Sequence, residues 1–99
     1  MITGYSIRQQ AQADLESIWL YSYQEWGAEQ ADQYIRSLLS RITWLSENPQ
    51  LGKQRTGVKP GYYCFPEGMH LIFYKITRSG IDIIGIPHQS TDIVSHFNV

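Results

Sequence analysis

The sequence has a single cysteine, Cys64, and no cluster of cysteine and histidine with the spacing of zinc ligands. An internal disulfide is therefore excluded, and we expect no structural metal. All apolar runs are far shorter than the roughly 20 residues of a membrane-spanning helix. The first residues also lack the basic region and apolar core of a secretion signal. We therefore expect a cytoplasmic protein that has no membrane contact.

Positive charge is also scarce. Eight Lys and Arg stand against nine Asp and Glu, which gives a formal net charge of −1. A protein that binds nucleic acid mainly through its phosphates needs a surplus of Lys and Arg. We therefore expect no direct, sequence-specific binding of nucleic acid by this chain alone.

Charged residues of either sign make up only 17% of the chain, and no long polar or repetitive tract occurs. This composition argues against disorder and against a solenoid. With 99 residues, of which 42% are hydrophobic, the chain is long enough for one core and too short for two. We predict a single domain over residues 1–99.

Two runs of β-branched and aromatic residues, 69–77 and 81–88, flank Arg78-Ser79-Gly80, a pattern typical of a β-hairpin. Both alternating sets of side chains in these runs are largely apolar, so we expect strands that are covered on both faces. Pro87 donates no hydrogen bond and should end the pairing just before His88. Two further strands are expected at 5–7 and 62–65, the latter turned by residues 66–68 into the central strand.

Apolar residues recur at spacings of three and four in two segments, which predicts two helices. The first stripe runs from Ala11 to Trp26 and ends at Gly27, and the second stops before Pro49. Residues 51–61 form a polar, glycine-rich connector, and Thr91-Asp92 could cap a short last helix. We predict an α+β fold with the order β-α-α-β-β-β, in which a helical hairpin packs on a small, mainly antiparallel sheet.

In this order the chain resembles the ParE toxins of the RelE/ParE superfamily of bacterial toxin–antitoxin modules. No single motif is specific, but the ordered set covers nearly the whole chain. The matching positions are Ala13-Asp14-Leu15 with Ile18, Trp26-Gly27 with Ala31 and Tyr34, Asn48-Pro49 with Gly52, Gly61, Phe65-Pro66, Gly68, His70, Ile72-Phe73-Tyr74, His88 and Asp92. The resemblance implies a RelE/ParE-like fold.

The resemblance also implies a toxin that inhibits DNA gyrase, blocks replication and is neutralised by a ParD-like antitoxin. Such inhibition acts by binding, so we expect no catalytic residue and no cofactor. The alternative is the RelE-like branch, whose members cut messenger RNA on the ribosome. That chemistry calls for a general base, a general acid and cations at the phosphate. His88 is the best single candidate, but we expect it to hydrogen-bond a neighbour such as Asp92.

A toxin that is neutralised by a partner needs an exposed apolar surface. We expect the helices to cover one face of the sheet and the antitoxin to cover the other. The expected antitoxin contacts are Ile72, Tyr74 and Ile76, or the alternate set, together with Trp19. Polar side chains or self-association are the alternatives for that face. The expected target-binding residues are Lys59, Tyr63, His88, Asp92, His96 and Phe97.

Two positions depart from the family pattern, because Tyr63 and Ser90 stand where many members have arginine. Tyrosine lacks the permanent charge and the planar fork of donors that arginine provides. We therefore expect attenuated toxicity with antitoxin binding retained. The alternative is that Tyr63 only packs, while Lys59 or Arg55 makes the contact.

Overall fold

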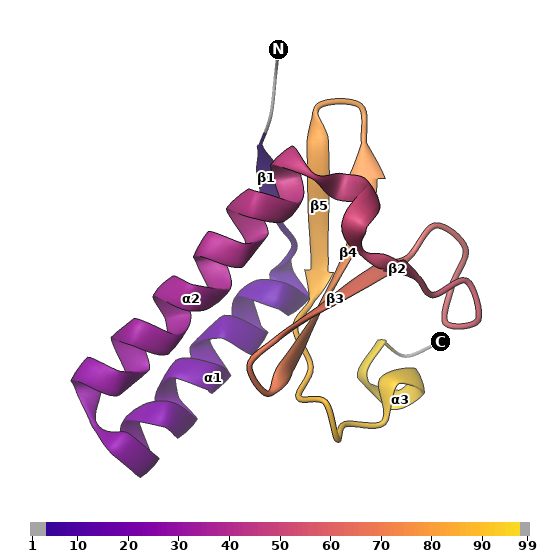
Figure 1. Ribbon diagram of the computed structural model, residues 1–99. Coiled ribbons are helices and arrows are strands. Elements are labelled where there is room, and N and C mark those ends of the chain that lie inside the picture. The colour runs from indigo at the N-terminus through magenta and orange to yellow at the C-terminus, as the bar shows by residue number, and fades with distance from the viewer. Residues whose placement is uncertain (1–3, 98–99) are drawn as a thin grey trace.

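The computed structural model of the protein describes residues 4–97 and has two helices on one face of a five-stranded sheet (Figure 1). The helices are α1 (Gln9–Trp26), α2 (Ala28–Glu47) and the short α3 (Ile93–Phe97). The strands are β1 (Tyr5–Ile7), β2 (Lys53–Gln54), β3 (Tyr63–Glu67), β4 (His70–Thr77) and β5 (Gly80–Gly85), and a 3₁₀ turn spans Pro49–Leu51. The predicted α+β fold with a helical hairpin is confirmed.

The strand order is β1-β5-β4-β3-β2, with β1 parallel to β5 and the other pairs antiparallel. The predicted hairpin between β4 and β5 is confirmed, with Arg78 and Ser79 in the turn. The predicted turn at residues 66–68 is displaced, because β3 continues through Glu67 and Pro66 pairs with Leu71. The strand β2 was not expected, since two residues in a polar connector carry no alternating pattern.

Glycine and proline end the two long helices where the sequence predicts. Gly27 has φ +91°, and its N–H donates to the carbonyl of Tyr23 at 2.9 Å. Glycine adopts this left-handed conformation without the steric cost that a Cβ atom brings. The helix α2 ends at Glu47, two residues before Pro49. The segment from α1 to α2 is therefore a tight antiparallel pair.

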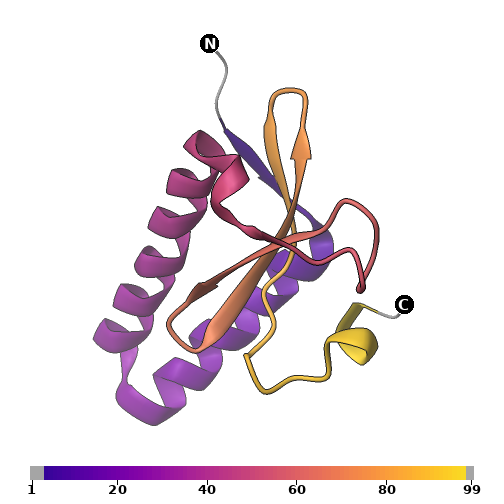
Figure 2. The same ribbon diagram turned by 45° about the vertical axis from the view of Figure 1, so that its right-hand side comes forward.

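The core has one cluster on each face of the sheet. On the helix side, Leu38 and Ile42 of α2 pack with Ile72, Tyr74 and other buried residues. On the opposite side, Tyr62, Cys64, Phe73 and Ile84 are buried, and Val58, Ile93 and Phe97 pack against them. Figure 2 shows α3 on the other side of the sheet from α2. The chain thus covers the second sheet face with its own connector and C-terminal helix.

This arrangement corrects the expectation for the antitoxin face. Ile72 and Tyr74 are 0% exposed, and Ile76 packs against the same cluster under the helices. These three side chains cannot line an open groove, because the helical hairpin needs this large apolar surface for its own burial. The prediction that they face a partner is wrong.

No helix among residues 4–97 is long and apolar enough to span a membrane.

Candidate functional site

A groove of about 660 Å³ runs along α1 and ends beside the last residues of β5. One side comes mainly from α1 and the other from the two chain segments around His70 and His88. The α1 side includes Asp14, Ile18, Tyr21, Ser22 and Trp26, and the facing side includes Met69, His70, Pro87 and His88. From Asp14 to Trp26 the helix rises roughly 18 Å, at about 1.5 Å per residue. The groove is therefore long enough to hold about three turns of another helix.

The mouth of the groove is apolar. Trp26 is 63% exposed and Tyr21 is 59% exposed, with their rings edge to face at 6.1 Å. Met69 is 53% exposed on the facing side. Leu20 is also exposed on α1 but does not line the groove. A helix with apolar side chains around its circumference is normally covered on more than one side. Exposed apolar patches of this kind mark interaction sites on soluble proteins.

The sequence pattern did not reveal this mouth. Trp26 belongs to the stripe predicted to be buried, yet it is exposed, because it is the last residue of α1 and the α1–α2 connection extends beyond the sheet (Figure 1). Leu20 and Tyr21 fall outside the stripe and could have been noticed as excess apolar residues.

Trp19, expected to contact the antitoxin, lies outside the groove. The Trp19 ring stacks on that of Tyr23, with the ring centroids 5.1 Å apart.

The indole nitrogen of Trp19 donates a hydrogen bond to Asp32 Oδ1 at 2.8 Å. This bond joins α1 to α2, so Trp19 helps to hold the helical hairpin together.

Two histidines lie side by side in the groove, with ring centroids 5.3 Å apart. The Tyr34 hydroxyl contacts His70 Nδ1 at 2.7 Å and accepts a hydrogen bond from the backbone N–H of Met69 at 3.0 Å. His88 Nδ1 accepts the backbone N–H of Ser90 at 3.1 Å and lies 2.8 Å from the Ser90 hydroxyl. His88 therefore hydrogen-bonds a neighbour, as expected, but this neighbour is Ser90 and not Asp92.

Burial lowers the pKa of His70 from 6.5 to about 4, and the neighbouring His88 adds to this shift while Asp14 opposes it. Desolvation disfavours the charged form of the ring. At neutral pH the groove therefore presents an uncharged His70.

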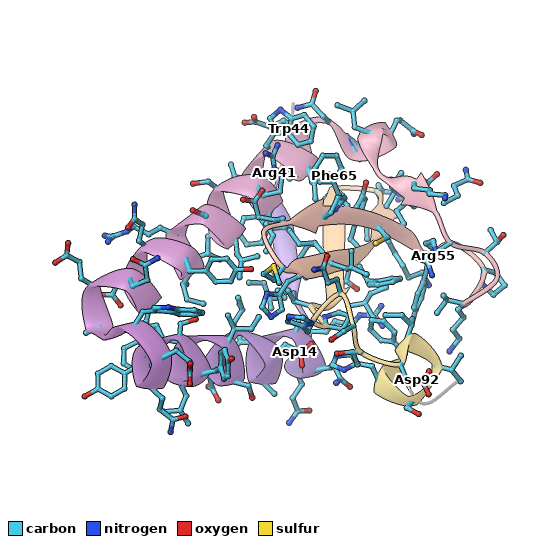
Figure 3. The ribbon with its side chains drawn as sticks, turned by 60° about the horizontal axis from the view of Figure 1, so that its bottom comes forward. Asp14, Arg41, Trp44, Arg55, Phe65 and Asp92 are labelled. Carbon is cyan, nitrogen blue, oxygen red and sulfur yellow. The ribbon has the colours of Figure 1, made fainter. Side chains whose placement is uncertain are left out.

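Asp14 ties three elements together at the end of the groove. Its Oδ2 atom accepts the backbone N–H of Ile86 at 2.7 Å and contacts His96 Nε2 at 2.9 Å. Figure 3 shows Asp14 on α1. One carboxylate thus joins three parts of the chain, namely α1, Ile86 just after β5, and α3. A single sequence offers no signal for this contact, since Asp14 and His96 lie far apart in the chain.

The short helix α3 is capped and anchored by its own residues. Asp92 Oδ1 accepts the backbone N–H of Val94 at 3.2 Å, which agrees with the predicted cap. The Phe97 ring packs against Phe73 at 4.9 Å and Tyr62 at 5.7 Å between centroids. Together with the His96 contact, this packing holds α3 against the second sheet face.

The six expected target-binding residues do not form one surface. His88 and His96 line the groove, while Asp92 and Phe97 cap and anchor α3. Lys59 is exposed in the connector. Tyr63 lies on the helix side of the sheet, where its ring stacks on Tyr74 at 5.5 Å. Ser90, the second departure from the family pattern, holds the His88 ring.

The structure separates the groups that RNA cleavage would combine. The guanidinium of Arg55 lies over the Phe73 ring at 5.5 Å, on the face of the sheet away from His70. Burial raises the pKa of the Cys64 thiol, although Arg55 nearby opposes the shift. A thiol with a raised pKa is a poor nucleophile at neutral pH. Within residues 4–97 no three His, Cys, Asp or Glu side chains are placed to hold a metal ion.

A second polar feature lies at the outer side of α2. The Arg41 guanidinium is 4.7 Å from the Trp44 ring centroid and 5.1 Å from that of Phe65, and its Nε atom contacts Glu67 at 2.9 Å. Figure 3 shows these aromatic side chains gathered around Arg41. The contacts join α2 to β3 and stabilise the packing of helix on sheet.

Comparison with known proteins identifies the family. The family model described as ParE toxin of type II toxin-antitoxin system, parDE, matches residues 5–93. Toxin ParE1 of Mycobacterium tuberculosis (strain CDC 1551 / Oshkosh) is 38% identical over 94 residues, which cover 94% of this chain and 96% of the relative. Toxin ParE1 of Caulobacter vibrioides is 37% identical over 92 residues, which cover 93% of this chain and 95% of the relative.

A solved structure, described as a chromosomal ParDE TA system from P. aeruginosa, has the same fold. Its TM-score is 0.75 at 18% identity, and the alignment covers 88% of this chain and 96% of that chain. The fold and the family match agree over nearly the whole length. The chain belongs to the ParE toxin family of type II toxin–antitoxin systems.

Proposed function

We propose that this toxin acts by binding its target and is silenced by a ParD-like antitoxin that places a helical segment in the groove along α1. The observation that carries the proposal is the groove itself, which combines a volume of about 660 Å³ with an exposed apolar mouth. Amphipathic helices dock in grooves of this kind through apolar anchors spaced three and four residues apart. Trp26, Tyr21 and Met69 would supply the surface that such anchors bury.

The same groove replaces the sheet face that the sequence pointed to. A partner in the groove would contact Tyr21 and Trp26 without displacing any core residue. Trp19 and Tyr23 form a stacked pair on α1 outside the groove lining, so the proposed contact does not include them. Partners that bury large aromatic side chains concentrate their binding energy on those residues.

For the target we propose DNA gyrase, inhibited without catalysis. Membership of the ParE family supports this target, and the separation of His70 from Arg55 on opposite faces of the sheet supports inhibition by binding. The proposed target surface is α3 with the neighbouring connector, where Asp92, Phe97 and Lys59 lie. The antitoxin groove reaches α3 through His96, so both surfaces meet at this helix.

Antitoxin binding is tested with the protein encoded beside the toxin gene. Calorimetric titration should show tight binding to the toxin. The double variant Tyr21→Ala with Trp26→Ala should weaken this binding at least about tenfold, because hot-spot aromatics each contribute more than about 1 kcal/mol. Leu51→Ala, which removes an exposed apolar side chain outside the groove, is the matched control. Equal affinities for the two variants would contradict the proposed groove.

The target is tested with two assays on the purified toxin. Inhibition of gyrase supercoiling, or accumulation of cleaved gyrase–DNA complexes, is the expected result. Cleavage of ribosome-bound messenger RNA with gyrase unaffected would replace this proposal with a RelE-like endoribonuclease.

A further inference from the structure

We propose that His70 and His88 form a pair of fixed N–H donors that receives the side-chain oxygen of an Asn or Gln from the antitoxin segment. The inference rests on the proposed function, since it names the chemistry of the residue that the groove selects. It depends on which nitrogen of each ring carries the proton, and we assign this from the hydrogen-bond partners of the two rings.

The proton of His70 lies on Nε2. The Tyr34 hydroxyl accepts the Met69 N–H, so its own single proton is free to be donated. The His70 Nδ1 atom at 2.7 Å is its shortest acceptor, because the Glu67 carbonyl lies at 3.4 Å. A neutral imidazole has one donor and one acceptor nitrogen. With Nδ1 accepting, Nε2 must be the donor.

The same argument places the proton of His88. The backbone N–H of Ser90 can only donate, and it points at His88 Nδ1 at 3.1 Å. The Nδ1 atom is therefore an acceptor, and the neutral ring carries its proton on Nε2. Both rings are thus oriented by a contact on Nδ1 that leaves the opposite nitrogen as a donor.

Both donor nitrogens are accessible. Among residues 4–97, no buried side-chain nitrogen or oxygen lacks a hydrogen-bond partner. Within these residues, the Nε2 atoms of His70 and His88 have no hydrogen-bond partner. Neither atom can therefore be buried, and both are accessible. The two rings line one groove with their centroids 5.3 Å apart. Ile18 and Pro87 line the same groove, and these two apolar side chains offer a bound oxygen no competing donor.

The acceptor that fits two uncharged donors next to a carboxylate is a carboxamide oxygen. Asp14 lies in the same groove, and a second carboxylate there would be repelled at low dielectric. The main-chain carbonyls of a helical segment are used inside the helix, so a side chain must supply the oxygen. One carboxamide oxygen has two lone pairs and can accept from both rings.

The free toxin provides the first test, which needs no antitoxin. Long-range ¹⁵N–¹H correlation spectra at neutral pH should show both His70 and His88 as the tautomer protonated on Nε2. An Nδ1–H tautomer for either ring would overturn the inference. This result stands whether or not an antitoxin binds.

The second test uses the complex with the antitoxin encoded beside the toxin gene. His88→Phe keeps the edge-to-face packing but removes one of the two donors. It should weaken binding about 10- to 100-fold, because one lone pair of the buried oxygen loses its hydrogen bond. His88→Gln retains an N–H donor and should recover most of this loss. Gln50→Ala, at an exposed glutamine outside the groove lining, should change the affinity by about twofold or less. Thermal melts confirm that each variant is folded.

The outcomes separate this inference from the proposed function. If the wild-type toxin binds no antitoxin, the proposed function fails. If it binds and His88→Phe behaves like Gln50→Ala, only the donor pair is wrong. On the antitoxin, one Asn→Asp or Gln→Glu change should weaken binding to the wild type and have little effect on binding to His88→Phe. Finding this coupling at an Asp or Glu of the antitoxin instead would overturn the choice of a carboxamide.

Discussion

Acid should destabilise the folded toxin through His70. The pKa of this ring is about 4 in the folded protein and 6.5 without the protein environment. Between these values the unfolded chain binds a proton that the folded chain does not. The stabilising contribution is therefore complete above about pH 6.5 and is lost as the pH falls through about 4.

The size of the effect follows from the shift. A difference between 6.5 and about 4 corresponds to an upper limit of about 3 kcal/mol. The His70 side chain is only partly buried, so solvent screening reduces the free energy of unfolding lost to roughly 1–2 kcal/mol. The main cause is burial of the ring, which disfavours its charged form, and the neighbouring His88 adds to the shift while Asp14 opposes it.

Urea unfolding at several pH values from about 7 to about 4 measures this loss. Carboxylates also titrate in the lower part of this range, so His70→Gln serves as the matched control that lacks the titrating ring. The wild type should lose more free energy of unfolding than His70→Gln over the same interval, by roughly 1–2 kcal/mol. NMR titration of the His70 ring should give a pKa near 4. Identical pH dependence of the two proteins, or a His70 pKa near 6.5, would refute the reasoning.

Three further substitutions test other contacts. Asp14→Asn should lower the free energy of unfolding by about 1–3 kcal/mol, because one carboxylate oxygen serves two hydrogen bonds; urea unfolding measures this. Gly80→Ala should lower the free energy of unfolding by about 2 kcal/mol or more, because the backbone has φ +152° there and the new Cβ would meet the Gly4 carbonyl; a thermal melt measures this. Gly57→Ala is the control, since its Cβ enters open space and should leave the stability nearly unchanged. Tyr63→Arg, expressed without antitoxin at matched level and folding, should slow growth more than the parent; equal or weaker inhibition would remove the basis for attenuation.

Local sequence patterns determined the secondary structure of this protein because their causes are local. Apolar spacing of three and four predicted both long helices, and Gly27 and Pro49 marked where they end. The turn at Arg78-Ser79-Gly80 identified the central hairpin. The ordered motifs that resemble the ParE family were also readable from the chain alone, and the family match confirms them.

Only the tertiary structure decided which face of β4 the helices cover. Both alternating sets of its side chains are apolar, so the pattern with a period of two cannot distinguish them. Packing places Ile72 and Tyr74 under α2. On the other face of β4, Phe97 of α3 packs against the alternate side chains, such as Phe73. The groove has the same origin, because Asp14, Tyr34, His70 and His88 come from distant parts of the chain. Each is an ordinary residue in its own segment, and a binding site results only where the folded backbone brings their side chains together.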